Sequence, residues 1–206
     1  MLARVRSAAV LGIDAYIVDV ESDIAHGLPS FATVGLPHGA VREGRERVGA
    51  AIVNAGFEFP LRRITINLAP ADIRKDGSAF DLPIALGILA ATGQLRVPHA
   101  MTTVDDARAQ LPNLDDYLVV GELGLEGELR PVRGALSVAL AARDAGMQGV
   151  VLPHQNIAEA SVVRGVAVLG ATSLGEVAGF FAGRNALTAP NRNGGKPPAA
   201  RRADAV

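Results

Sequence analysis

The sequence predicts an α/β (α+β) domain in which a mixed sheet packs against helices. The strongest evidence is the segment Leu82 to Ala91, which is apolar almost all round and therefore belongs at the centre of a domain. A buried strand, Ile64–Leu68, and a charged loop, Asp72–Ser78, precede this helix. Segments with strand and helix periodicity also alternate along the first 184 of the 206 residues. With 49% hydrophobic residues, the chain can bury one sizeable core.

The N-terminal part predicts three strands and one helix before residue 60. Alternating apolar residues indicate strands at Ala3–Leu11, Ala15–Glu21 and Ser30–Val34. The helix Gly39–Ala55 has one apolar side, and Gly56 follows it as a left-handed cap. Its other side carries the opposite-charge pairs Arg42/Glu46 and Glu43/Arg47 at i,i+4 spacing. We interpret this side as a solvated face laced by ion pairs, and the alternative is that its arginines face a partner or a nucleic-acid backbone.

The C-terminal part predicts a polar loop, a hairpin and a further series of strands and helices. Residues Arg96 to Asp116 indicate an exposed loop or weak helix, and Tyr117–Val132 indicates a hairpin that turns around Gly124–Gly127. The remaining predicted elements are a helix at Gly134–Asp144 capped by Gly146, a strand at Gly149–Leu152, a short helix at Asn156–Ala160, a strand at Val166–Leu169 and a helix at Leu174–Phe181. Residues 185–206 contain almost no large apolar residue, which is typical of a flexible tail or linker.

Composition excludes several classes of function. The absence of cysteine excludes disulfides, thiolate zinc sites and a cysteine nucleophile. No apolar stretch reaches membrane-spanning length, and Asp14 and Asp19 interrupt the short N-terminal apolar run too early for a signal peptide, so we expect a cytoplasmic protein with no membrane contact. The net charge of −1 argues mildly against autonomous binding of nucleic acid. Of the 20 basic residues, only Lys75 and Lys196 are lysines.

Ser78 has three possible roles at the start of the central helix: a cap, a nucleophile or part of an anion site. A nucleophilic serine needs a base, usually a histidine or a desolvated lysine. The four histidines, His26, His38, His99 and His154, are scattered through loops, and Asp76 is expected to keep Lys75 charged. The favoured interpretation is a capping box formed by Ser78 and Asp81. The helix N-terminus beside Arg74 and Lys75 could also receive an anion.

No cofactor motif is present in the chain. Nothing matches the phosphate-binding loop G-x-x-x-x-G-K-[ST], and no H-E-x-x-H or carboxylate–histidine cluster indicates a metal. Two tyrosines and no tryptophan make binding of single strands by base stacking unfavourable. We therefore expect no cofactor or metal in these 206 residues.

Two segments resemble the Lon protease domain. The run Lys75-Asp76-Gly77-Ser78 at the start of the apolar helix resembles the Lon motif P-K-D-G-P-S-A-G, although the proline before the serine is missing here. The segment Gly121–Pro153 resembles the second Lon motif region. The resemblance places Ser78 at the position of the nucleophile and Leu136 at the position of the catalytic lysine. It implies that the serine–lysine dyad is lost, so that the domain has no catalytic residue.

A closer resemblance is to the N-terminal domain of the ComM/YifB family of magnesium-chelatase-like AAA+ proteins. It covers residues 2 to 183, and its motifs include FATVGLPHGAVREGRERVGAAI, GFEFPLRRITINLAPADIRKDGSAFDLPIALGILAATGQL and VVGELGLEGELRPVRGAL. The resemblance implies a fold similar to domain 2 of ribosomal protein S5, as in Lon and the C-terminal domain of RadA. It also implies that residues 1–184 form this domain and that residues 185–206 link it to an AAA+ ATPase module absent from the chain.

The family resemblance implies hexameric rings that act as DNA helicases in branch migration during natural transformation, with ATP and Mg bound by the absent module. We therefore expect a non-catalytic accessory domain that assists DNA engagement or ring assembly. The alternatives are a docking or oligomerisation module without DNA contact and a divergent serine hydrolase that uses Ser78. The residues expected to contact DNA are Arg42, Arg45, Arg47, Arg62, Arg63, Arg74 and Lys75.

Overall fold

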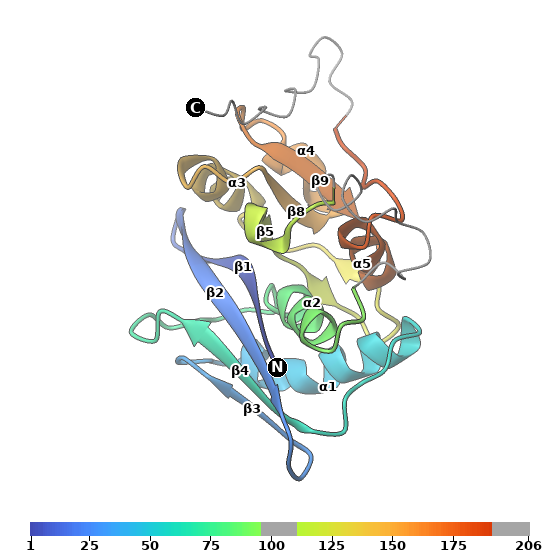
Figure 1. The fold of residues 1–206 in the computed structure, drawn as a ribbon. Coiled ribbons are helices and arrows are strands. Elements are labelled where there is room, and N and C mark those ends of the chain that lie inside the picture. The colour runs from blue at the N-terminus through green and yellow to red at the C-terminus, as the bar shows by residue number, and fades with distance from the viewer. Residues whose placement is uncertain (96–110, 191–206) are drawn as a thin grey trace, which may run out of the picture.

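A seven-stranded mixed sheet organises the molecule in the computed structural model, which describes residues 1–95 and 111–190. The strands lie in the order β3-β4-β2-β1-β5-β8-β9 (Figure 1). Their bounds are β1 Leu2–Leu11, β2 Asp14–Ala25, β3 Ser30–Val34, β4 Arg63–Ala69, β5 Tyr117–Val119, β8 Gly149–Pro153 and β9 Ala167–Ala171. The pairs β1/β2 and β2/β4 are antiparallel, whereas β3/β4, β1/β5, β5/β8 and β8/β9 are parallel. The predicted mixed sheet with packed helices is confirmed.

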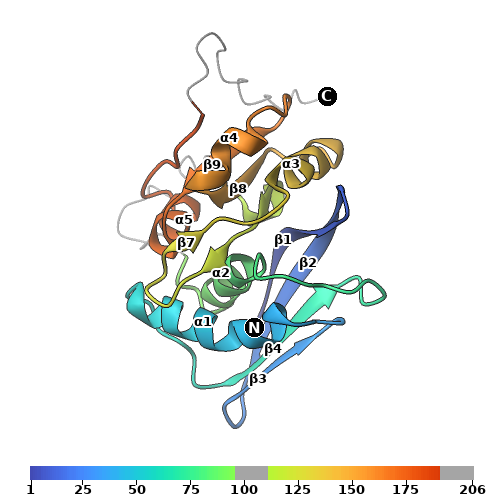
Figure 2. The same cartoon turned by 180° about the vertical axis from the view of Figure 1, so that it is seen from behind.

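Helices cover the sheet on both faces, and each face has its own apolar cluster (Figures 1 and 2). The larger cluster joins strands β1, β2 and β4 to α1 (Ala40–Asn54), α2 (Asp81–Ala91) and α5 (Leu174–Phe181). The smaller cluster joins β5, β8 and β9 to α3 (Ala135–Asp144) and α4 (Ile157–Ala160). Two 3-10 turns, Leu114–Asp116 and His154–Asn156, complete the described helical elements.

Helix α2 is the centre of the larger cluster. Its five large aliphatic residues are all buried, with exposed fractions of 2% or less: Leu82, Ile84, Leu86, Ile88 and Leu89. An isolated helix of this length is marginal in water, so the packing on all its sides stabilises it. The prediction of a central apolar helix is confirmed.

The predicted hairpin forms around Gly124–Gly127, where Glu122–Leu123 pairs antiparallel with Leu129–Arg130, but it does not extend over all of residues 117–132. β5 leaves the segment to pair with β1 and β8, and the remaining strands, β6 (Glu122–Leu123) and β7 (Leu129–Arg130), form a separate two-stranded sheet. The break comes at Gly121, whose N–H donates to the carbonyl of Ala79 and whose carbonyl accepts from the N–H of Leu82. These bonds hold the segment against the start of α2.

The helix α1 lies close to its predicted bounds, but the two predicted i,i+4 ion pairs on it do not form. Arg45 instead pairs with Glu46 at 3.7 Å, and Arg47 pairs with Asp81 of α2 at 2.7 Å. Gly56 follows the helix with a φ of +85°, as the predicted left-handed cap requires.

The ordered body continues past the expected domain boundary at residue 184. Gly170 and Thr188 exchange two backbone hydrogen bonds, of 2.7 and 3.1 Å, which attach the chain after α5 to the outer edge of β9. The first part of the expected linker is therefore attached to the edge of β9 at Thr188. Residues 191–206 of that linker, and residues 96–110 of the expected polar loop, lie outside the described residues.

Candidate functional site

Ser78 lines a cavity of about 640 Å³ at the start of the central helix. The cavity lies between the end of β1, at Ala8–Val10, and residues 131–133, which follow β7. Its polar lining comes from Asp76, Ser78, Glu122 and Arg133. A space of this size is within the range of small-ligand sites, so this cavity is the candidate site of the domain.

The Ser78 hydroxyl donates a hydrogen bond to the carboxylate of Glu122. Glu122 belongs to β6, and its other carboxylate oxygen lies 3.9 Å from the guanidinium of Arg130 on the paired strand β7. The two oxygens of the Glu122 carboxylate thus face two partners, the Ser78 hydroxyl and the Arg130 guanidinium. This arrangement orients the hydroxyl of Ser78 towards Glu122.

The predicted capping box of Ser78 and Asp81 is wrong. Helix α2 begins at Asp81 with Phe80 as the N-cap, and no side chain caps it. Ser78 contributes only its carbonyl, which accepts from the N–H of Asp81 at 3.1 Å. Its hydroxyl is bonded to Glu122 instead, and the Asp81 carboxylate is bonded to Arg47 and to the N–H of Leu123. Both side chains have stronger partners from distant parts of the chain than the helix end offers.

Lys75 is fully buried, and its ammonium group donates to the backbone carbonyl of Pro70. The pKa of Lys75 is lowered by burial, and the charge of Asp72 opposes this shift. The expected partner, Asp76, contacts the N–H of Gly77 and lies 3.7 Å from His38 instead. Lys75 is directed into the loop that follows β4, and no bond joins it to Ser78. Lys75, one of the residues expected to contact DNA, has no accessible surface in the folded domain.

No histidine of the described residues is bonded to Ser78. His38 contacts a guanidinium nitrogen of Arg74 at 2.6 Å, and His26 and His154 lie in other parts of the fold. His99 lies outside the described residues. The described part of the chain therefore offers Ser78 a carboxylate partner and no imidazole or amine.

Leu136 lies in the first turn of α3 and is 38% exposed. It is not among the residues that line the cavity with Ser78, and α3 contributes Val138 instead. The backbone N–H of Leu136 donates to Glu159 at 3.2 Å. The correspondence between Leu136 and the Lon lysine therefore still rests on the sequence resemblance.

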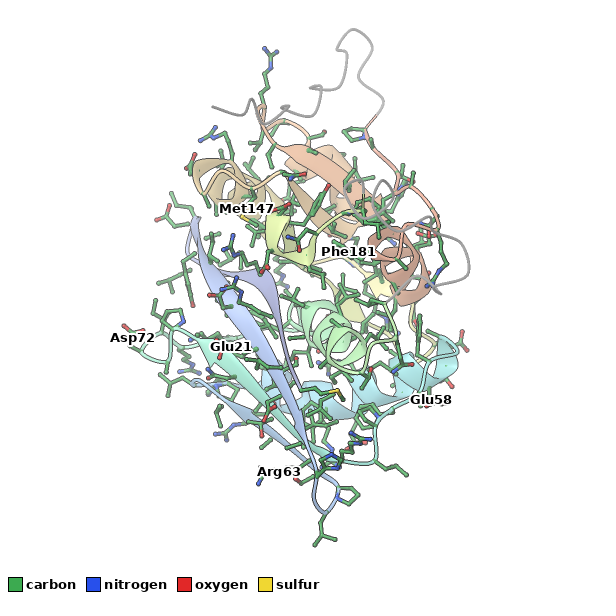
Figure 3. All side chains as sticks on the ribbon, viewed as in Figure 1. Glu21, Glu58, Arg63, Asp72, Met147 and Phe181 are labelled. Carbon is green, nitrogen blue, oxygen red and sulfur yellow. The ribbon has the colours of Figure 1, made fainter. Side chains whose placement is uncertain are left out.

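The arginines expected to contact DNA lie on α1, at the start of β4 and after its end. Arg47 is held by Asp81 in a pair between helices, with its side chain only 22% exposed. Arg62 and Arg63 are exposed at the start of β4, whereas Arg74 follows the end of that strand. Figure 3 shows this separation, since Arg63 and Asp72 lie at opposite ends of β4. Arg42 and Arg45 lie on α1.

Sequence reasoning missed Glu122, and it assigned Asp81 and Arg47 to the wrong partners. The carboxyl group of Asp81 is buried, and its pKa is raised to about 6 by this burial, against the opposing effect of the Arg47 guanidinium. Glu122 lies 44 positions from Ser78, and Asp81 lies 34 positions from Arg47. No local spacing could have indicated either contact.

Residues 1–95 and 111–190 contain no group of three or more metal-ligating His, Cys, Asp or Glu side chains. Within the same residues, no helix has both the length and the apolar character needed to cross a bilayer.

Comparisons with known proteins match most of this chain. Residues 20–156 match the family described as subunit ChlI of Mg-chelatase. YifB of Salmonella typhimurium is 42% identical over 189 residues, which are 92% of this chain and 34% of the relative. The competence protein ComM of Haemophilus influenzae is 40% identical over 186 residues, or 90% of this chain and 34% of the relative. A Lon protease of Chloroflexus aurantiacus is 27% identical over 149 residues, or 68% of this chain and 16% of the relative. The chain thus spans about a third of the length of the YifB and ComM relatives.

Proposed function

The chain belongs to the magnesium-chelatase-like family that includes YifB and ComM, and on this premise we propose that it is a non-catalytic accessory domain of a ring-forming AAA+ ATPase. The parent protein in this proposal is a ComM-like hexameric DNA helicase that acts in branch migration during natural transformation. ATP and Mg²⁺ bind to its ATPase module and not to the residues described above. The domain assists ring assembly or the engagement of DNA.

The hydrogen bond between Ser78 and Glu122 carries the non-catalytic part of the proposal. In a serine–lysine dyad the hydroxyl needs a neutral amine within hydrogen-bond reach. Here the hydroxyl is bonded to a carboxylate, and the buried Lys75 is bonded to Pro70. The additional negative charge of Asp76 on the cavity wall would oppose the oxyanion that forms during acyl transfer. These features support loss of the protease chemistry.

The arrangement of the basic residues supports a role in assembly more strongly than a role in DNA binding. Two of the seven expected DNA contacts, Arg47 and Lys75, are used inside the fold. The other five are exposed arginines on α1, at the start of β4 and after its end, so a single domain makes at most five of these phosphate contacts. DNA engagement therefore requires the ring, in which several copies multiply the contacts.

The experiment compares the full-length protein with a form that lacks residues 1–184. If the domain assists assembly, the truncated protein should hydrolyse ATP as a monomer or small oligomer at concentrations where the full-length protein is hexameric in light scattering. If it assists DNA engagement, the truncated protein should remain hexameric and bind DNA with a smaller dependence on salt concentration. A truncated protein with unchanged assembly, DNA affinity and helicase rate would contradict the proposal.

The contribution of Arg74 to DNA binding is tested in the full-length ring. Arg74→Ala removes one guanidinium and should lower the salt slope of DNA binding by about one unit for each phosphate that this guanidinium neutralises. Arg164→Ala, which changes an exposed arginine far along the chain, is the matched control. An equal salt slope of DNA binding in both variants would show that the Arg74 loop does not contact DNA.

A further inference from the structure

The two edges of the seven-stranded sheet differ in how they are covered. The outer edge of β9 is closed by the two backbone hydrogen bonds between Gly170 and Thr188. The other edge is β3, and across the described residues no backbone or side-chain group is bonded to its outer side. An uncovered edge strand can pair with a strand from another chain, and proteins usually protect such edges.

The register of β3 and β4 identifies the open backbone groups. In a parallel pair, alternate residues of a strand direct both N–H and C=O to the neighbouring strand. The N–H of Ser30 donates to the carbonyl of Arg62, so Ser30, Ala32 and Val34 face β4. The N–H and C=O groups of Phe31 and Thr33 therefore point away from the sheet. They offer two donors and two acceptors to an added strand.

The strand SFATV has none of the usual protection against pairing. Residues 30–34 contain no charge and no proline, and they pair regularly with β4 over five residues. Val34 is 46% exposed, so an apolar side chain is also available beside the open backbone. Natural edges that do not pair usually carry lysine, proline or a bulge. This edge is suited to receive a partner.

The charge around the edge is positive, although the whole chain has a net charge of −1. Arg63 is registered with Ser30 of β3, and Arg62 precedes it. Among the described residues, neither guanidinium forms an ion pair or hydrogen bond. The guanidinium of Arg45 lies 5.9 Å from the centre of the Phe31 ring and pairs with the exposed Glu46. The unpaired charges at the start of β4 favour an acidic partner.

We propose that β3 binds an extended acidic segment of a partner protein by strand addition, with Arg62 and Arg63 pairing with its carboxylates. A peptide backbone satisfies both the donors and the acceptors of Phe31 and Thr33, whereas a nucleic acid would leave part of this backbone unpaired. Pairing of β3 with the same strand of a second copy would leave Arg62 and Arg63 without a carboxylate partner on the added strand, because residues 30–34 carry no charge. This assignment does not require the proposed ring, and it gives Arg62 and Arg63 a protein partner in place of the DNA contact considered above.

The experiment measures binding of three labelled probes to the purified 206-residue chain by fluorescence anisotropy. The probes are a peptide of about ten residues with alternating Glu and Val, the corresponding Lys–Val peptide and an oligothymidine of similar length. We expect the Glu–Val peptide to bind at least about tenfold more tightly than the Lys–Val peptide, with an affinity that falls as salt screens the charges. The double substitution Arg62→Glu and Arg63→Glu should weaken its binding by about tenfold.

The matched control changes the same number of charges elsewhere. The double substitution Arg164→Glu and Arg184→Glu also reverses two exposed arginines, and it should change the affinity less than about twofold, since these residues are far from β3 in the sequence and the sheet order. Thr33→Pro removes one outward N–H. It should weaken the binding of the Glu–Val peptide without affecting the hydrogen bonds between β3 and β4.

Amide exchange provides a second measurement that does not depend on a variant. Binding of the Glu–Val peptide should slow hydrogen exchange at Phe31 and Thr33, whose N–H groups are otherwise open to water. Failure of the peptide to bind, or binding without protection of these two amides, would overturn the inference. Tighter binding of the oligothymidine, weakened by the Arg62/Arg63 reversal but not by Thr33→Pro, would instead assign the two arginines to nucleic acid.

Discussion

The guanidinium of Arg47 holds the carboxylate of Asp81 through two hydrogen bonds of 2.7 and 3.2 Å, and this pair joins α1 to the first residue of α2. The same guanidinium donates to the carbonyl of Ala40 at 3.0 Å, and the carboxylate accepts from the N–H of Leu123 at 3.4 Å. One ion pair therefore connects the start of α1 with α2 and β6. Leu123 directly follows Glu122 in β6, so the same pair helps to position the carboxylate that binds Ser78.

Substitution of Arg47 should destabilise the fold more at alkaline than at acidic pH. The folded-state pKa of Asp81, about 6, is above the ordinary value of 3.8, so its contribution to the free energy of unfolding falls as pH rises through this range. Arg47→Met removes the guanidinium that opposes this rise, so the pKa of Asp81 should be higher still in the variant. We expect a cost of roughly 3–5 kcal/mol at a pH of about 8 and a smaller cost at a pH of about 5, where the carboxyl group is protonated. Urea unfolding at both pH values measures the difference, with Arg42→Met as the control; equal costs at the two pH values would contradict the assignment.

Shortening any of the buried side chains of the central helix should lower the free energy of unfolding. Leu86→Ala leaves a cavity among side chains that are fully buried, and we expect it to lower the free energy of unfolding by about 2–5 kcal/mol. Leu28→Ala, at a residue 88% exposed, should change it by less than about 0.5 kcal/mol. Denaturant unfolding of the two variants tests the pair. A Leu86 variant as stable as the Leu28 variant would be inconsistent with a helix packed on every side.

Lys75 should make the stability of the domain rise with alkaline pH. Its pKa is lowered in the folded state from 10.5, so the unfolded chain binds the proton more tightly between the two values. The free energy of unfolding therefore increases as pH rises from the lowered pKa towards 10.5. Lys75→Met keeps the length of the side chain and removes this charge. The difference in stability between the wild-type chain and Lys75→Met should shift in favour of the wild type on going from a pH of about 7 to a pH of about 10.

The two tyrosines with raised pKa values, Tyr16 and Tyr117, titrate equally in both proteins, so their effect cancels in this comparison. A difference that is constant with pH would show that Lys75 is equally charged in the folded and unfolded chains. It would also weaken the conclusion that its ammonium group is desolvated.

Ser78 should be unreactive towards serine-directed reagents. A fluorophosphonate probe requires an activated hydroxyl, and the only group bonded to this one in the described residues is the Glu122 carboxylate. We expect no labelling of the wild-type chain at neutral pH after incubation that fully labels an active serine hydrolase. Labelling that is lost in Ser78→Ala and retained in Ser137→Ala would support the alternative that the domain is a divergent hydrolase.

Several elements of the fold could be predicted from the sequence because their cause is local. The run from Leu82 to Leu89 is apolar at every helical position, so any fold that contains it must surround it. The strands near residues 3–11 and 64–68 follow from alternation and from β-branched residues, and Gly56 follows from the need for positive φ after α1. The family motifs are also a property of the sequence alone.

The partners of the polar side chains were decided by the tertiary structure. Ser78 could cap α2 by spacing, yet its hydroxyl is bonded to Glu122, which only the placement of β6 against α2 brings within reach. Arg47 could pair with Glu43 along its helix, yet a buried carboxylate on α2 holds it more strongly than a solvated one could. The tertiary structure likewise decided that Lys75 is buried and that the outer edge of β3 is open. Burial and strand pairing depend on the long-range order of the sheet, and a charge or an open backbone group acquires its role only when that order determines what faces it.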